Sequence, residues 1–74
     1  MLQYVRVSYY RSRNVYIDGT VSGRTNKTLR VDEGTHMFDL GPDPNYKPAS
    51  ITTSVTGTTA IKPLALLFEP TKFD

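Results

Sequence analysis

The stretch Val15-Tyr16-Ile17-Asp18-Gly19 decides the fold class. Val15 and Ile17 alternate with Tyr16, which is the period-two pattern of a strand with one buried face. Asp18 and Gly19 follow at once, and both residues tolerate the positive φ that a tight primed hairpin turn demands. The stretch therefore predicts a strand that runs into a hairpin.

The composition extends this prediction to the whole chain. Val, Ile, Thr, Tyr and Phe supply 27 of the 74 residues, and such side chains suit a half-buried pleated surface. A chain of this length forms one small domain, which excludes most clefts with a lid or a second lobe. No window predicts a helix, and no apolar run reaches the length of a membrane span. We expect one all-β domain with no membrane insertion.

Alternation and turn residues continue on both sides of the first hairpin. Turns are predicted at Asp32-Glu33-Gly34 and over Gly41 to Asn45, and Thr56-Gly57 is a candidate hairpin. We expect about seven short strands in a small antiparallel β-sandwich over residues 1–68, with residues 69–74 as a C-terminal tail or the start of a linker. The expected inward positions are Val5, Val7, Val15, Ile17, His36, Phe38, Leu40, Ile51, Thr53 and Val55.

The order of these elements resembles the PEGA domain, a small β-sandwich module of bacterial and archaeal proteins that is common in cell-envelope proteins. The resemblance covers about Val5 to Phe68. Gly23 is expected to allow a bulge or a close backbone approach, and Tyr46 to anchor the long loop against the sandwich. The residues that carry the pattern are Asp18, Gly19, Gly23, Thr25, Gly34, His36 and Tyr46.

The chain departs from the family pattern at its first loop. The tetrapeptide that names the family should fall at Tyr10-Arg11-Ser12-Arg13, and none of the four residues matches. The Pro that usually follows Thr25 is also replaced, by Asn26. Without the expected Pro and Gly, the conformation of this loop stays open. The loop is the natural place for a function private to this chain.

Catalytic and metal chemistry find little support. His36 is the only histidine, and its place on the inward face favours a structural, hydrogen-bonded role over that of a general base. The chain has no Cys, and Asp39, Asp43 and Asn45 lack the regular spacing of a calcium loop. Asp and Asn are ordinary turn residues. We expect no enzyme activity, no metal and no cofactor.

The candidate ligand-binding residues are Tyr9, Tyr10, Arg11 and Arg13. Exposed tyrosines beside arginines can stack on sugars or bases, and arginine can bind a phosphate or carboxylate with two hydrogen bonds. A solvated turn with no ligand explains the same residues. The net charge of +2 is too small to favour nucleic acid by itself.

The closing apolar strand offers a second candidate contact. Leu64, Leu66 and Phe68 lie on one face, and Ala65 and Leu67 lie on the other. Pro63 indicates an edge strand, because proline cannot donate a ladder hydrogen bond. An apolar outer face on an edge strand is typical of contact with a second copy or a neighbouring domain, but a single exposed leucine needs no such explanation. The candidate interaction residues are Pro63, Ala65 and Leu67.

These features favour a non-catalytic binding, adhesion or spacer module that acts through protein–protein or glycan contacts. The alternative is a small basic nucleic-acid-binding module that uses the Arg-rich first thirty residues. The two hypotheses differ in their expected salt dependence, which is steep only for phosphate contacts. The sequence leaves the location open, and the family resemblance points towards the cell envelope or the extracellular space.

Overall fold

The computed structural model describes residues 1–71, which form nine short strands and no helix. No part of this range could therefore cross a membrane as a helix. The strands are β1 (Leu2–Ser8), β2 (Asn14–Ile17), β3 (Thr20–Arg24), β4 (Thr28–Asp32), β5 (Gly34–Asp39), β6 (Tyr46–Lys47), β7 (Ile51–Val55), β8 (Leu64–Leu67) and β9 (Glu69–Pro70).

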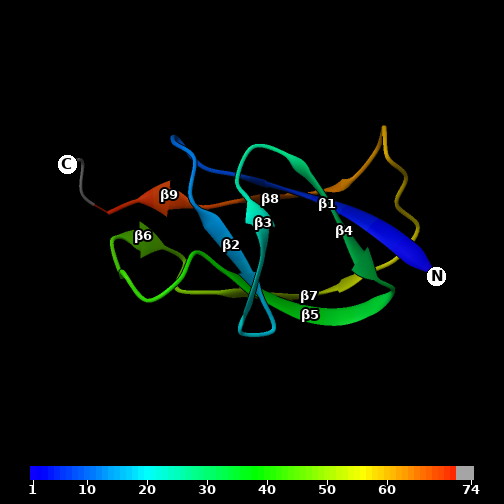
Figure 1. Ribbon diagram of the computed structural model, residues 1–74, viewed down its shortest axis with the longest axis horizontal. Coiled ribbons are helices and arrows are strands. Elements are labelled where there is room, and N and C mark those ends of the chain that lie inside the picture. The colour runs from blue at the N-terminus through cyan, green and yellow to red at the C-terminus, as the bar shows by residue number, and fades with distance from the viewer. Residues whose placement is uncertain (72–74) are drawn as a thin grey trace.

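Two sheets face each other and enclose the core (Figure 1). One sheet has the strand order β4-β1-β8, and the other has the order β3-β2-β5-β7. A small third sheet pairs β6 with β9 at one end of the molecule (Figure 1). The prediction of a small all-β sandwich is confirmed.

Two details of the fold differ from the prediction. The pairing of β1 with β8 is parallel, whereas the other named strand pairs are antiparallel. A parallel neighbour must be reached by a crossover connection, and here the chain crosses from β7 in one sheet to β8 in the other. The strand count exceeds seven because β6 and β9 have two residues each, too few for alternation to show.

The C-terminal boundary lies later than expected. Glu69 and Pro70 pair with Lys47 and Tyr46, and the backbone N–H of Thr71 donates to the carbonyl of Asn45. The first three residues of the expected tail, 69–71, therefore bond to the chain around β6. The rest of the expected tail, residues 72–74, lies outside the described residues.

The first hairpin forms as its sequence predicts. Asp18 and Gly19 have φ values of 53° and 84°, so both central turn residues are left-handed as a type I′ turn requires. Val15 pairs with Gly23 but Tyr16 pairs with Val21, which leaves one extra residue on β3. The bulge expected at Gly23 is therefore present. A Cβ at Gly23 would also overlap Cδ2 of Leu29, so the expected close approach to the Gly23 backbone is present as well.

The expected hairpin at Thr56-Gly57 does not form. Gly57 is left-handed, with a φ of 69°, but the chain then leaves the four-stranded sheet and crosses the open end of the sandwich. There the buried side chain of Gln3 accepts hydrogen bonds from both the backbone N–H and the hydroxyl of Thr58. The hydroxyl oxygen of Thr58 in turn accepts from the backbone N–H of Tyr4. This contact fixes a crossover where the turn residues Thr56-Gly57 predicted a hairpin.

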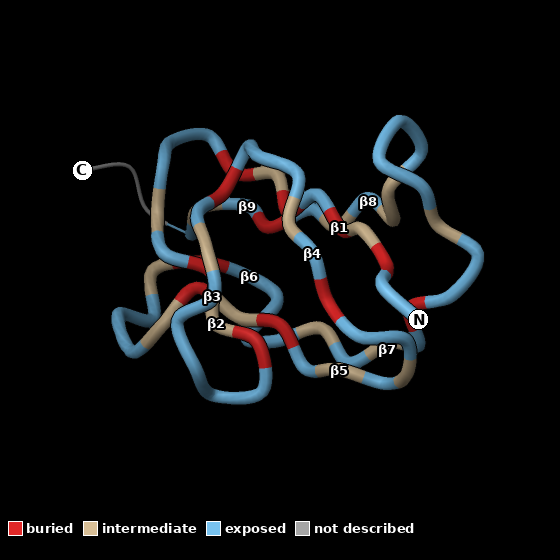
Figure 2. Tube along the Cα trace, turned by 45° about the vertical axis from the view of Figure 1, so that its right-hand side comes forward, coloured by how far each residue is buried: buried red, intermediate tan, exposed pale blue. Residues whose placement is uncertain are grey.

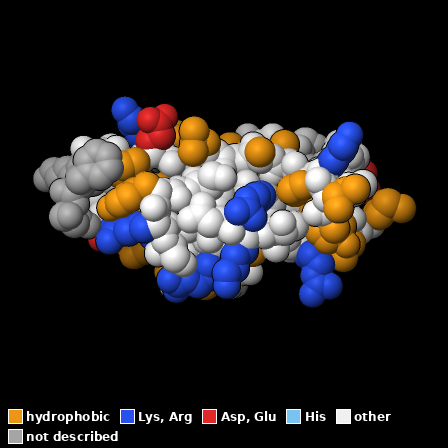
Figure 3. All heavy atoms as spheres, turned by 90° about the horizontal axis from the view of Figure 1, so that it is seen from above, with side chains coloured by type: hydrophobic (Ala, Val, Ile, Leu, Met, Phe, Trp, Pro, Cys, Tyr) orange, Lys and Arg blue, Asp and Glu red, His pale blue; other side chains and the backbone are white. Residues whose placement is uncertain are grey.

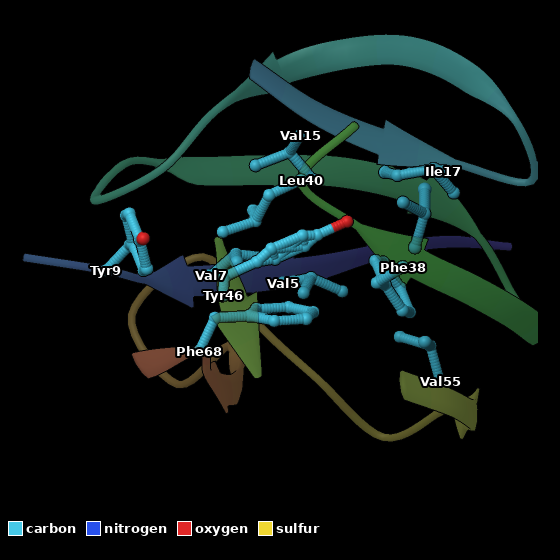
Figure 4. Packing of buried hydrophobic residues seen from close by; sticks show 11 residues of the cluster. Val5, Val7, Tyr9, Val15, Ile17, Phe38, Leu40, Tyr46, Val55 and Phe68 are labelled. Atoms are coloured by element: carbon cyan, nitrogen blue, oxygen red, sulfur yellow. The ribbon is translucent and has the colours of Figure 1, made fainter. Parts of the chain in front are cut away.

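The core lies between the sheets, where buried positions alternate along β1, β2 and β5 (Figure 2). Phe38 lies towards one side of it, with Ile17 and Val55. Tyr46 and Phe68 lie towards the other side and pack edge to face, with their ring centroids 5.6 Å apart (Figure 4). The buried apolar residues are Val5, Val7, Tyr9, Val15, Ile17, Val31, Phe38, Leu40, Tyr46, Val55 and Phe68.

Candidate functional site

Tyr9 belongs to the core and not to an exposed patch. Its side chain is only 6% exposed, and it continues the inward alternation of Val5 and Val7 beyond the end of β1 (Figure 4). The prediction of an exposed Tyr9 is therefore wrong. The signal that could have corrected it was in the sequence, because residue 9 stands two positions after Val7.

The side chain of Arg13 makes contacts within the fold. We call these contacts, with Tyr9, Asn45 and Tyr46, the Arg13 clamp. The Arg13 guanidinium donates to the side-chain oxygen of Asn45 and to the carbonyls of Leu40 and Asp43. The guanidinium carbon also lies 5.6 Å and 5.0 Å from the ring centroids of Tyr9 and Tyr46. The predicted ligand-binding role of Arg13 therefore competes with a structural one, which ties the first loop to the long loop before β6.

Tyr10 and Arg11 lie on the outer side of this clamp, where the Tyr10 ring contacts the Tyr9 ring with the centroids 5.0 Å apart. Tyr10 is 48% exposed, Arg11 is exposed, and the Arg11 guanidinium lies over the Tyr10 ring at 5.5 Å. The structure therefore divides the four predicted residues into an inner pair, Tyr9 and Arg13, and an outer pair, Tyr10 and Arg11. Only the outer pair remains a candidate contact surface.

Thr25 and Asn26 hold the first loop from behind. The buried hydroxyl of Thr25 accepts from the backbone N–H of Arg13 at 2.9 Å and donates to the carbonyl of Arg11 at 2.8 Å. Asn26 accepts from the backbone N–H of Tyr9 through its side-chain oxygen and donates its own N–H to the carbonyl of Val7. These bonds fix the loop without the Pro and Gly of the family pattern.

The same geometry explains why Asn stands where the family has Pro. Asn26 has a φ of 65°, whereas the proline ring holds φ near −65° and leaves no N–H. Asparagine is one of the few residues that adopt the left-handed region readily. Sequence reasoning noticed the missing Pro but assigned Asn26 no role.

His36 connects two turns by what we call the His36 bridge, formed with Asp18 and Asp32. Its Nδ1 lies 2.6 Å from a carboxylate oxygen of Asp18, and its Nε2 lies 2.6 Å from the backbone carbonyl of Asp32. Both partners are acceptors, so each ring nitrogen must carry a hydrogen when both bonds are made. The geometry thus confirms a hydrogen-bonded His36, and both of its ring nitrogens are engaged in this arrangement.

The bridge shifts the protonation of both its ionisable groups. The carboxylate of Asp18, followed by the carbonyl of Asp32, raises the pKa of His36 above its ordinary value of 6.5. The backbone N–H of Met37, followed by His36, lowers the pKa of Asp18 below its ordinary value of 3.8. Both shifts favour the form in which the two side chains are a charged pair.

The oxygen atoms of the long loop are used within the fold. Asp39 accepts from the backbone N–H of Gly41 at 2.9 Å, and the side chain of Asn45 belongs to the Arg13 clamp. The Tyr46 hydroxyl donates to the carbonyl of Gly41 at 2.8 Å, as expected for an anchor of this loop. Residues 1–71 contain no group of three His, Asp or Glu side chains placed to hold a metal.

β8 is an edge strand of the three-stranded sheet, and Pro63 stands directly before it. Ala65 and Leu67 point outward, and Leu67 is 60% exposed. Leu64 and Leu66 are half-buried on the other face, packed against the core. The edge position and the apolar outer face are therefore present.

Comparison with protein-family models gives one match, to the PEGA domain, over residues 8–67. The matched segment is 60 of the 74 residues, since both end residues count. The chain belongs to the PEGA domain family. Comparison with curated proteins and with solved structures gives no match.

The family is one of non-catalytic modules, and the signature residues of this PEGA domain act through backbone geometry and internal hydrogen bonds. Asp18 and Gly19 form the hairpin turn, Thr25 holds the first loop and Tyr46 holds the long one. Gly34 has a φ of 134° where the chain passes from β4 in one sheet to β5 in the other. The residues of the family pattern thus specify the scaffold, and the first loop lies between elements that they hold in place.

Proposed function

We propose that this PEGA domain is a contact or spacer module of a cell-envelope or surface protein, which acts through protein–protein or glycan contacts. The observation that carries the proposal is the presentation of Tyr10 and Arg11. Both side chains stand outward between Tyr9, which is buried, and Arg13, which is clamped. A contact pair held in this way loses little conformational entropy on binding.

A titration of the labelled domain tests this proposal. Soluble cell-wall glycan fragments and then an oligonucleotide are added at low and at physiological salt, and backbone amide shifts are followed by NMR. Shifts at Tyr10 and Arg11 with weak salt dependence support a glycan contact. A steep fall in affinity with salt would instead favour the nucleic-acid alternative, because phosphate contacts release counterions.

The matched variants separate binding from folding. Tyr10→Ala combined with Arg11→Ala should leave the unfolding midpoint nearly unchanged and weaken the binding of a glycan or protein ligand. Lys47→Ala removes an exposed cation from β6 and serves as the control. Equal affinity of the double variant and the control would refute the role of this pair.

We also propose the β8 edge as the contact for a second copy or a neighbouring domain. Its support is the exposed face of Ala65 and Leu67 on an edge strand. Sedimentation of the domain over a range of concentrations measures self-association. Leu67→Lys should shift any dimer towards monomer, and a domain that stays monomeric at high concentration would exclude the second copy.

A further inference from the structure

A hollow of about 260 Å³ opens between the edge strands β3 and β4, away from the first loop. Its apolar surface comes from Leu2, Ile17 and Val31, and its polar surface comes from Ser22, Arg30, Asp32 and His36. Ser22 is the extra residue of the bulge in β3, and bulges often redirect a side chain towards a site. The volume fits one ring-sized group better than a drug-sized ligand.

The hydrogen-bonding groups of the hollow define what it can hold. The Arg30 guanidinium offers only donors, and the Asp32 carboxylate offers only acceptors. The Ser22 hydroxyl donates to the carbonyl of Thr20 at 2.9 Å, so its oxygen can still accept. Both nitrogens of His36 are taken by the His36 bridge. A ligand with an anionic acceptor for Arg30 and hydroxyl or N–H donors for Asp32 and Ser22 would match these groups.

Arg30 also faces the outer surface of the three-stranded sheet. It pairs directly with Tyr4 on β1, and Arg6 stands two residues further along the same face. Among residues 1–71 neither Arg6 nor Arg30 makes an ion pair. Figure 3 views the side of the molecule on which β1 and β8 lie in Figure 1, and blue Lys and Arg side chains recur along its length.

The outer face of the four-stranded sheet differs in charge. Its outward side chains on β5 and β7 are Thr35, Met37, Asp39, Thr52 and Ser54. The cation that borders this face, Arg24, is bonded to the side chains of Ser12 and Asn14. Within residues 1–71, Arg6 and Arg30 thus lie on the outer face of the three-stranded sheet, next to the hollow that Arg30 lines.

We infer that the hollow between β3 and β4 binds one sugar ring of an acidic polysaccharide, with the carboxylate of that ring on Arg30. The apolar surface from Leu2, Ile17 and Val31 receives the C–H face of the ring. The polysaccharide then continues over Tyr4 towards Arg6, which offers a second cation for a carboxylate. Two cations and one tyrosine are too few for the phosphate contacts and stacked bases of a nucleic-acid site.

This inference rests on the proposed role as a contact module but uses residues distinct from Tyr10 and Arg11. Its test is a titration of the labelled domain with a tetramer of galacturonate, followed by NMR shifts and calorimetry. A neutral galactose tetramer and a single-stranded thymidine oligonucleotide are the comparison ligands. We expect shifts at Ser22, Arg30 and His36 with the acidic tetramer, and much smaller shifts with the other two.

Three variants give effects of different sign. Arg30→Gln should weaken binding of the acidic tetramer roughly tenfold, as for loss of a hydrogen bond to a charged group. Asp32→Asn should tighten it about twofold, because a like charge is removed while the backbone carbonyl that His36 uses stays. Lys47→Gln removes an equal charge from β6 and should change nothing. Unfolding midpoints of all three variants establish that each is folded.

Several results would overturn the inference. These are shifts confined to residues 10–13, equal binding of the neutral tetramer, tighter binding of the oligonucleotide, or an Arg30→Gln variant that binds as well as Lys47→Gln. The Tyr10→Ala and Arg11→Ala double variant should keep its affinity for the acidic tetramer. Loss in that variant alone would support the loop and refute the hollow.

Discussion

The Arg13 clamp and the His36 bridge each tie separate loops together, but their chemistry responds differently to pH. Arginine side chains are not deprotonated in proteins, and the partners of Arg13 are amide and carbonyl oxygens and two tyrosine rings. The His36 bridge makes both of its bonds only when the imidazole is protonated. The hydrogen bonds of the His36 bridge therefore depend on the protonation of the imidazole, and those of the Arg13 clamp do not.

The largest expected effect comes from the anchor behind the first loop. Asn26→Pro restores the residue of the family pattern but removes the N–H bonded to Val7 and forces a φ that conflicts with the observed 65°. We expect a loss of about 3 kcal/mol in the free energy of unfolding, measured by urea denaturation. An unchanged midpoint would mean that the loop is not held by Asn26.

Asn26→Gly is the matched control for this variant. Glycine keeps the left-handed φ and the N–H, and it loses only the side-chain bond from the Tyr9 N–H. The expected loss is about 1 kcal/mol. A loss as large as that of the Pro variant would assign the effect to the side chain and not to the backbone.

The Arg13 clamp gives the next effect. Arg13→Ala should lower the free energy of unfolding by about 2 kcal/mol, because the hydrogen bonds to the long loop and the two ring contacts are lost together. The loss should be the same at about pH 5 and about pH 8. Arg13→Lys should recover less than half of it, since an ammonium cannot reproduce the planar donor geometry. A loss that varies strongly with pH would contradict the contrast with His36.

The His36 bridge gives the smallest effect and the only pH-dependent one of the three. The pKa of His36 is raised, so its contribution is complete below pH 6.5 and disappears as the pH rises through the higher value in the folded state. The pKa of Asp18 is lowered, so its contribution is present above pH 3.8 and disappears as the pH falls through the lower value. The bridge should therefore stabilise the domain most between these two limits.

His36→Gln tests this window through the thermal midpoint. The variant should melt roughly 4 °C below the natural sequence at about pH 5, and this gap should narrow as the pH rises through the raised pKa of His36. The control Thr53→Val changes the residue that pairs with His36 on β7 and should shift both midpoints equally. A constant gap between His36→Gln and the natural sequence at all pH values would show that the bridge does not titrate.

Local patterns predicted the parts of the fold that depend on local physics. Alternation placed Val15, Ile17 and Phe38 in the core, and Asp18-Gly19 specified its hairpin through allowed backbone angles alone. The same rule extended by one step would have placed Tyr9 inside. The aromatic and basic residues 9–13 look like one exposed cluster in the sequence, and this pattern favours the opposite prediction for Tyr9. The structure divides these residues between the core and the surface.

Long-range contacts escaped the sequence because their partners have no fixed spacing. Arg13 meets Asn45 across 32 residues, and Gln3 meets Thr58 across 55. The parallel neighbour of β1 likewise follows from a crossover that no local pattern encodes. The hollow between β3 and β4 also depends on long-range packing, because its lining residues come from β1 to β5 and meet only in the folded chain.

The parallel pairing of β1 and β8 also has a mechanical consequence. Because the two strands run in the same direction, β1 begins at one end of the shared ladder and β8 leaves it at the other (Figure 1). Tension that pulls the start of β1 away from the end of β8 slides the strands along each other. All their hydrogen bonds then resist at once, whereas a hairpin pulled at its open end yields one bond at a time. If the domain is linked to neighbours at both ends of its chain, tension between them would load β1 and β8 in shear, the direction in which the pair resists best.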